Sequence, residues 1–198
     1  MKVAPGGIAR AAVPLVAAPV GLVVHPLFSL ALVGLGAFTL YFFRDPDRSP
    51  PATGVVSPAD GTVSVIREED DRMRIGVYMN ALDVHVNRAP LDGPVESVEH
   101  VPGGHRLAFS KESEHNERVH VVLPEARVTL IAGAFARRVV PYVEAGDEPA
   151  RGDRIAHIAF GSRADVLLAP AYDRGDVHVT EGEGVRAGET VLADDPDR

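Results

Sequence analysis

The segment "HIAFGSRADV", residues 157–166, carries the pattern that decides the fold class, because apolar and polar residues alternate on both sides of a Gly–Ser pair. Alternation with a period of two residues predicts a β-strand with one buried face. No helix start follows Gly161 and Ser162, and the strand pattern resumes after them. The sequence therefore predicts one strand over residues 157–166, with a flexible glycine and a hydroxyl group in its middle.

Many similar strand patterns follow the proline-rich segment "RDPDRSPPATG", residues 44–54, and they are separated by Gly, Pro and Asp. Long stretches with the 3.6-residue period of a helix are absent from this part of the sequence. We therefore predict a mainly β domain over residues 44–198, built as a sandwich or a barrel.

Two of these patterns point to a more specific architecture. The segments "SPADGTV", residues 57–63, and "GEGVRAGETVL", residues 182–192, resemble the strand–turn elements of biotinyl and lipoyl barrel sandwiches. Glycine supplies the positive φ angles that such tight corners need. A carrier domain of that kind also needs a lysine at a hairpin tip, and Lys111 lies in a segment without a hairpin pattern. The expected fold is barrel-sandwich-like, and a carrier function has only this architecture in its favour.

The first 43 residues have a different composition. They contain no Asp or Glu, and residues 11–43 contain no Lys or Arg. A run of this length exceeds the roughly 20 helical residues that cross a bilayer. We expect Pro14, Pro19 and Pro26 to interrupt the run, with a break at His25–Pro26.

Residues 1–43 are therefore predicted to be an apolar helical membrane segment. Two arrangements remain open. One is a single membrane span over residues 26–43, and the other is a hairpin of two short apolar helices in one leaflet. A buried core helix is the alternative without a membrane. A cleaved signal peptide is disfavoured, because no small-residue cleavage site follows the run.

The charge and cysteine content exclude several classes of function. All 28 Asp and Glu residues lie after residue 43, so the β domain is strongly acidic and a nucleic-acid partner is not expected. The chain contains no Cys, which excludes disulfides, thiolate metal ligands and a cysteine nucleophile. No histidine spacing typical of a metal site occurs, and we expect no metal.

Three residues are of the types that activate a hydroxyl nucleophile. They are Asp60 in "SPADG", His85 in "LDVHVNRAP" and Ser162 in "FGS". In such a site the base takes the serine proton and the carboxylate holds the tautomer of the base. Most β domains contain all three residue types, so their spacing alone does not establish a site.

A family resemblance adds specificity to these residues. The segments "YFFRDPDR", "VVSPADGTV", "VYMNALDVHVNRAPLDGPV", "SEHNERV", "RGDRIAHIAFGSRADVLL" and "GEGVRAGETVLA" follow one another in the order found in the short, archaeal and bacterial form of the phosphatidylserine decarboxylase family. The chain resembles that family over residues 40–193, and its apolar N-terminus resembles it in character only. An archaetidylserine decarboxylase is the variant of this resemblance that would act on ether-linked lipid tails.

The resemblance implies a proenzyme that cuts its own chain between Gly161 and Ser162. The hydroxyl of Ser162 would attack the preceding carbonyl, and the residue would become a pyruvoyl group with loss of ammonia. Its ketone would form a Schiff base with the substrate amine and accept electrons on loss of CO₂, so no external cofactor is expected. The two cleaved chains would stay associated.

The resemblance also implies roles for individual residues. Asp60 would be the activating carboxylate and His85 the base. Longer family members carry a second histidine three positions later, where this chain has Arg88. Either His85 serves both cleavage and decarboxylation, or another group takes one of these roles. Because arginine stays protonated, Arg88 is expected to bind the substrate phosphate or carboxylate instead. His105 and His115 are further candidates for the headgroup site.

The resulting hypothesis is a pyruvoyl enzyme that decarboxylates a serine phospholipid to the ethanolamine lipid. It would be peripheral or monotopic at the cell membrane, with the catalytic domain in the cytoplasm, and a homo-oligomer is left open. One alternative is a pyruvoyl decarboxylase of a soluble amino acid. The other is a membrane-tethered, carrier-like β domain without enzymatic activity.

Overall fold

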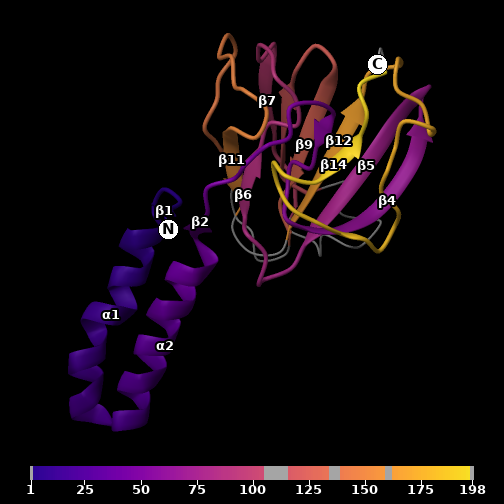
Figure 1. The fold of residues 1–198 in the computed structure, drawn as a ribbon. Helices are drawn as coiled ribbons and strands as arrows, with labels where there is room; N and C mark the ends of the chain where they lie inside the picture. Colours follow the sequence, from indigo (N-terminus) through magenta and orange to yellow (C-terminus); the bar gives the residue numbers. More distant parts are fainter. Residues whose placement is uncertain (1, 105–115, 134–138, 159–161, 197–198) are drawn as a thin grey trace. The chain divides into compact units, whose positions relative to one another are not determined.

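The computed structural model describes residues 2–104, 116–133, 139–158 and 162–196. The contacts divide the chain into two compact units, Met1–Asp47 and Arg48–Arg198. The first unit contains the helices and the second contains the sheets that hold the candidate site (Figure 1).

Two apolar helices form the first unit, α1 (Gly7–Val24) and α2 (Pro26–Phe42). The short strands β1 (Lys2–Val3) and β2 (Arg44–Asp45) pair antiparallel and hold the two ends of this unit together. Helix α1 is long and apolar enough to cross a membrane, and α2 is a slightly shorter apolar helix. The prediction of an apolar helical N-terminus is confirmed.

The break between the helices lies at His25, as the sequence predicts. His25 has an extended backbone, its Nδ1 accepts a hydrogen bond from the backbone N–H of Leu27 at 3.2 Å, and Pro26 opens α2. Pro14 and Pro19, however, lie inside α1. The expectation that they interrupt the helical run is wrong, because α1 continues through both residues; Pro14 is buried and Pro19 is exposed.

The helices lie side by side, and many of their large apolar side chains are exposed. A Cβ atom on Gly36 of α2 would overlap the side chain of Leu15 in α1, so the glycine permits the close approach. Val16, Val23 and Leu30 are 75%, 88% and 65% exposed. An exposed apolar area on both helices is typical of a surface that contacts lipid.

A seven-stranded antiparallel sheet is the largest element of the second unit. Its strands lie in the order β13 (Gly184–Val185), β4 (Gly61–Glu69), β5 (Arg72–Met79), β12 (Ser162–Leu168), β9 (Ala126–Ile131), β8 (Arg118–Val122) and β7 (Ser97–Val101). One face is apolar and fully buried, with residues such as Ile75, Val128 and Val166 in a single core cluster.

Two smaller sheets complete this unit. One contains β10 (Val139–Pro141), β11 (Arg154–Ile158) and β6 (Val86–Arg88), and the other contains β14 (Val191–Ala193) and β3 (Val55–Val56). All of the strand pairs are antiparallel. The prediction of a mainly β domain is confirmed.

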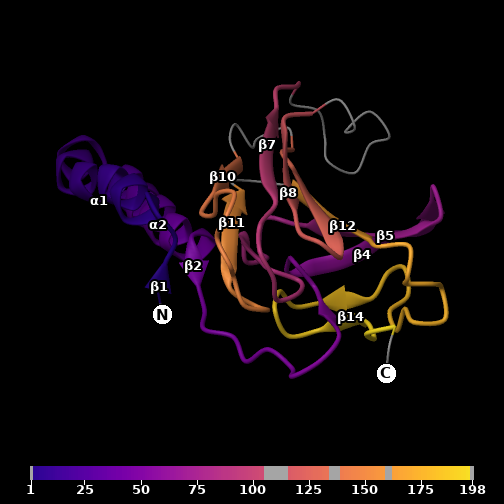
Figure 2. The same ribbon diagram turned by 90° about the horizontal axis from the view of Figure 1, so that it is seen from above.

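The expectation of one continuous strand over residues 157–166 is wrong. Strand β11 ends at Ile158 in the three-stranded sheet, whereas β12 begins at Ser162 in the seven-stranded sheet. Figure 2 shows β10 and β11 apart from β12, β5 and β4. Alternation predicted that each strand has a buried face, but it carries no information on which sheet that strand joins.

Candidate active site

Contacts at Ser162 and at Ile158 tie two strands of different sheets to one stretch of chain, residues 79–86. Strand β12 begins opposite the end of β5, where Ser162 pairs with Met79. On the other sheet, His157 pairs with Val86, and the backbone N–H of Ile158 donates to the carbonyl oxygen of His85 at 3.1 Å. The strands before and after residues 159–161 are therefore both anchored to the segment that contains His85.

Ser162 is fully buried at the first position of β12. Its side chain belongs with Ala164 and Val166 on the core face of the sheet, because side chains alternate along a strand. The Oγ atom has no hydrogen-bond partner in the part of the chain that the structure describes. A buried hydroxyl without a partner costs free energy, and such groups concentrate where an atom is held for a reaction.

His85 is also buried, with 3% exposure, directly before β6. Its Nδ1 lies 3.0 Å from the carbonyl oxygen of Asp83. A carbonyl can only accept a hydrogen bond, so Nδ1 carries the proton in the neutral ring and Nε2 carries the lone pair. This tautomer is the one in which Nε2 can act as a base.

A tight turn fixes the carbonyl that orients His85. The carboxylate of Asp83 accepts from the backbone N–H of Asn80 at 2.7 Å, and the side-chain oxygen of Asn80 accepts from the N–H of Leu82 at 2.8 Å. The sequence "NALD" therefore forms a turn that is closed by its own side chains. The turn fixes the position of the Asp83 carbonyl, and this carbonyl orients the ring of His85.

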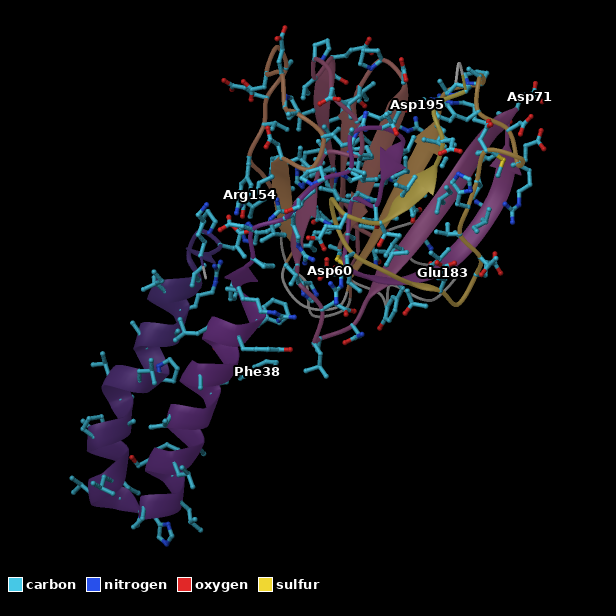
Figure 3. The ribbon with its side chains drawn as sticks, in the orientation of Figure 1. Phe38, Asp60, Asp71, Arg154, Glu183 and Asp195 are labelled. Atoms are coloured by element: carbon cyan, nitrogen blue, oxygen red, sulfur yellow. The ribbon has the colours of Figure 1, made fainter. Side chains whose placement is uncertain are left out.

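Asp60 lies in a different set of contacts. Its carboxylate accepts two hydrogen bonds from the guanidinium of Arg48, at 2.9 and 2.8 Å, and one from the backbone N–H of Ala187 at 2.8 Å. Arg48 also donates to Glu189 at 3.1 Å. Figure 3 places Asp60 at the end of the sheet opposite Asp71, which follows β4. The contact that orients His85 in this structure comes from Asp83, and the expected role of Asp60 stays a prediction.

Arg88 is 4% exposed and ends β6, three residues after His85. Its guanidinium donates to the carbonyl oxygen of Gly152 at 2.8 Å. A Cβ atom on Gly188, which has a φ of +72°, would lie 2.9 Å from Cδ of Arg88. The side chain thus passes between two glycines, and its expected role in binding an anion stays a prediction.

Asn87 is a site residue that our sequence reasoning did not single out. Its side chain is fully buried, and Nδ2 lies 3.4 Å from the carbonyl oxygen of Pro58 and 3.8 Å from Sδ of Met79. Met79 is the residue that pairs with Ser162. The spacing of two residues from His85 was the available signal, because residues two apart in extended chain have side chains on the same side.

Three predicted site residues, Gly161, His105 and His115, lie outside the described residues. His157, which lies four residues before Gly161 in the sequence, is buried, and its Nδ1 lies 2.7 Å from the hydroxyl of Tyr142. The described part of the chain contains no group of three or more His, Cys, Asp or Glu side chains that could hold a metal ion.

The comparisons with known proteins agree with one another. The family model described as phosphatidylserine decarboxylase matches residues 35–193. A protein of Halobacterium salinarum with the provisional name archaetidylserine decarboxylase proenzyme is 69% identical over 81% of this chain and 83% of its own length. The phosphatidylserine decarboxylase proenzymes of Streptomyces avermitilis and Solibacter usitatus are 49% and 40% identical, over 80% and 100% of this chain and 74% and 99% of their own lengths. No solved structure matches the chain. The chain belongs to the phosphatidylserine decarboxylase family.

Proposed function

We propose that the chain cuts itself between Gly161 and Ser162 and then decarboxylates the serine headgroup of a phospholipid. Membership of the family makes the chain a pyruvoyl-dependent carboxy-lyase formed from a proenzyme. The observation that supports this cut site is the buried Ser162 Oγ, which has no hydrogen-bond partner among the described residues. His85, which is held in the basic tautomer, lies in the stretch that is anchored to Ser162 and Ile158.

The cleavage reaction follows from the residue types at the bond. Nε2 of His85 takes the proton of the Ser162 hydroxyl, and Oγ attacks the carbonyl carbon of Gly161. The C–N bond breaks, the amine of Ser162 takes up a proton, and an ester joins the two residues. Removal of the Ser162 Cα proton then expels the Gly161 carboxylate. Water finally replaces the nitrogen on Cα, and ammonia leaves.

The residue before Ser162 supplies a chemical reason for cleavage at this bond. Glycine before the serine removes the Cβ atom that would obstruct attack on the carbonyl.

The group derived from Ser162 supplies a ketone that condenses with the substrate amine and accepts the electron pair released with CO₂. The residues around Ser162 fit such a group, because the position is fully buried on the core face of the sheet. His85 remains beside it and is the chain's candidate to return a proton to the substrate carbon. Asp60 is proposed to support that base, and Arg88, His105 and His115 are proposed to bind the anionic headgroup.

The lipid substrate is consistent with the N-terminal unit. A substrate with two acyl or isoprenoid tails stays in the bilayer, and the exposed apolar side chains of α1 and α2 provide the membrane contact. We propose that this hairpin makes the enzyme monotopic, with the β unit in the cytoplasm. We also place the β unit in the barrel-sandwich class, from the glycine corners at Gly61, Gly182 and Gly188, which all have positive φ.

Tail chemistry separates phosphatidylserine from archaetidylserine, and the two share one headgroup. The relative with 69% identity favours archaetidylserine. The test is to supply purified full-length protein in mixed micelles with each lipid and with free serine, and to measure CO₂ and the amine product. We expect turnover of at least one serine lipid and none of free serine. Turnover of free serine equal to that of the lipids would instead indicate an enzyme for a soluble amino acid. No turnover of any of these compounds would indicate a non-enzymatic domain.

A further inference from the structure

A pocket of about 330 Å³ opens on the seven-stranded sheet, away from the candidate active site. Asp165 and Leu167 of β12 line it. Side chains at odd positions of β12 point to the opposite face of the sheet from Ser162, which is on the core face. The pocket is therefore separated from the catalytic serine by the thickness of the sheet.

The pocket is positively charged in an otherwise acidic protein. The full chain has a formal net charge of −8. The described charged side chains that line the pocket comprise four arginines and two carboxylates, namely Arg67, Arg74, Arg118, Arg127, Glu69 and Asp165. A local surplus of positive charge against the sign of the whole chain is an electrostatic feature that attracts anions.

Both carboxylates are already engaged at one end of the pocket. Arg74 bonds to Asp165, and it also bonds to Glu69 at 2.9 Å. Arg67 lies 3.4 Å from Glu69 as well. Burial of Arg74 tends to lower its pKa, but the two carboxylates outweigh that effect and raise it, so this part of the pocket is neutralised internally.

At the other end of the pocket, no described carboxylate neutralises the charge of Arg127. This residue extends from β9 and forms no ion pair within the described ranges of the chain. Next to it, Nδ1 of His120 in β8 lies 2.9 Å from the hydroxyl of Thr129 in β9. If the hydroxyl donates to Nδ1, then Nε2–H of His120 is a donor on the same face as Arg127.

The charges around His120 agree with this arrangement. Burial lowers the pKa of His120, and the positive charges of Arg127 and Arg118 lower it further. Glu99, which lies opposite His120 in β7, acts in the other direction but does not reverse the shift. The protonated imidazole is thus disfavoured until an anion offsets these charges.

We propose that this pocket binds a phosphate group between Arg127 and His120, with Thr129 orienting the imidazole. A guanidinium presents paired N–H donors that match two phosphate oxygens, and Nε2–H of the imidazole supplies a donor from a different direction. The phosphate can belong to a phospholipid headgroup or to a free phosphate compound, since both present the same oxygens. The site is independent of the decarboxylation proposed above, because it lies on the other face of β12.

The test follows the imidazole signal of His120 by NMR in the full-length protein, assigned with a His120→Gln variant. Inorganic phosphate is added at constant ionic strength maintained with sodium chloride. We expect phosphate to raise the pKa of His120 and Arg127→Gln to weaken phosphate binding about tenfold. Arg186→Gln is the matched control, because it removes one arginine charge from a side chain that is 75% exposed and outside the pocket.

A second arm distinguishes the two sources of phosphate. The same signal is followed in phosphatidylcholine bicelles with and without phosphatidylglycerol. A shift that needs phosphatidylglycerol and is lost in Arg127→Gln assigns the site to a lipid headgroup. A response to inorganic phosphate alone assigns it to a free phosphate compound. The proposal is overturned if phosphate moves the His120 signal no more than chloride does, or if Arg127→Gln and Arg186→Gln bind phosphate equally.

Discussion

At the scale of single residues, the environment of Ser162 destabilises a hydroxyl group at rest and leaves its oxygen available for reaction. The group is fully buried, and its oxygen lacks a hydrogen-bond partner among the described residues. The carbonyl of Asp83 holds His85 in one tautomer, and the backbone carbonyl of His85 accepts from the N–H of Ile158. Replacing either side chain should therefore affect chemistry more than folding.

Ser162→Ala is expected to abolish cleavage, because no other atom at this position can perform the shift from nitrogen to oxygen. The variant should be at least as stable as the uncut chain, since it removes a buried polar atom without a partner. Denaturing electrophoresis and thermal unfolding measure the two properties. Ser97→Ala in β7 is the control and should be cleaved as the native chain is. Cleavage of Ser162→Ala at the same bond would remove the serine from the mechanism.

His85→Ala is expected to slow cleavage, decarboxylation or both, by a factor of about 10² to 10⁴, as for loss of a general base. Single-turnover cleavage of freshly synthesised chain and steady-state release of CO₂ separate the two steps. His178, whose side chain is half exposed, provides the control substitution His178→Ala. Native rates in both steps would exclude His85.

At the scale of elements, the ion-pair network around Arg48 joins parts of the chain that are far apart in sequence. Arg48 precedes the first strands of the β unit, whereas Glu189 and Ala187 lie 141 and 127 residues after their partners. The side chain of Arg48 is only 8% exposed, and that of Asp60 is 15% exposed. The network therefore connects the N-terminal edge of the unit to the segment between β13 and β14.

Arg48→Ala should lower the free energy of unfolding by about 2 kcal/mol, because it leaves the Asp60 carboxylate with one charged partner fewer in a mostly buried position. Urea unfolding is best measured in the uncut Ser162→Ala background, where both segments belong to one chain. Arg186→Ala in the same background removes an exposed arginine 4.0 Å from Glu189 and should change stability by less than about 0.5 kcal/mol. Equal unfolding midpoints for the two variants would contradict a stabilising role of the network.

The strands and helices also show which features of the fold the sequence could predict. Alternating residues correctly predicted strands on both sides of Gly161, and His25–Pro26 correctly predicted the break between the helices. The change of sheet after Ile158 was missed, because alternation reports the face of a strand and not its neighbours. Pro14 was misjudged, because its burial depends on long-range packing that a local rule does not contain, and nothing in the structure explains the tolerance of the exposed Pro19.

The candidate site was predicted in part for the same reason. The residue types and the family resemblance named Ser162, His85 and Asp60. Asn87 and Arg48 were not named, because their importance depends on contacts with Met79 and Glu189 that the sequence does not reveal. The hydrogen bond from His85 to Asp83 was likewise hidden, since it uses a backbone atom.

At the scale of the whole molecule, the segment after Ser162 is distributed over the sheets of the β unit. Strand β12 lies between β5 and β9, β13 pairs with β4, and β14 pairs with β3. Every one of these partners precedes the proposed cut. A single broken peptide bond would leave all of these pairings in place.

We therefore expect the two chains to remain together after cleavage. An affinity tag after Arg198 should recover residues 1–161 and 162–198 in equal amounts under native conditions, and the two should separate only in denaturant. Mixing tagged and untagged processed protein before purification controls for exchange of the short chain. Recovery of the short chain alone under native conditions would show that the strand pairings do not hold the molecule together.

The most direct test of the account is intact-mass spectrometry of purified, active protein. The account predicts two chains of 161 and 37 residues. The shorter chain should be lighter than a peptide that starts with serine by the mass of one ammonia. On reduction with borohydride in the presence of an added amine, it should gain the mass of that amine and two hydrogens and lose the mass of one water. A single uncut chain of 198 residues with an unmodified Ser162 in an active preparation would contradict the account.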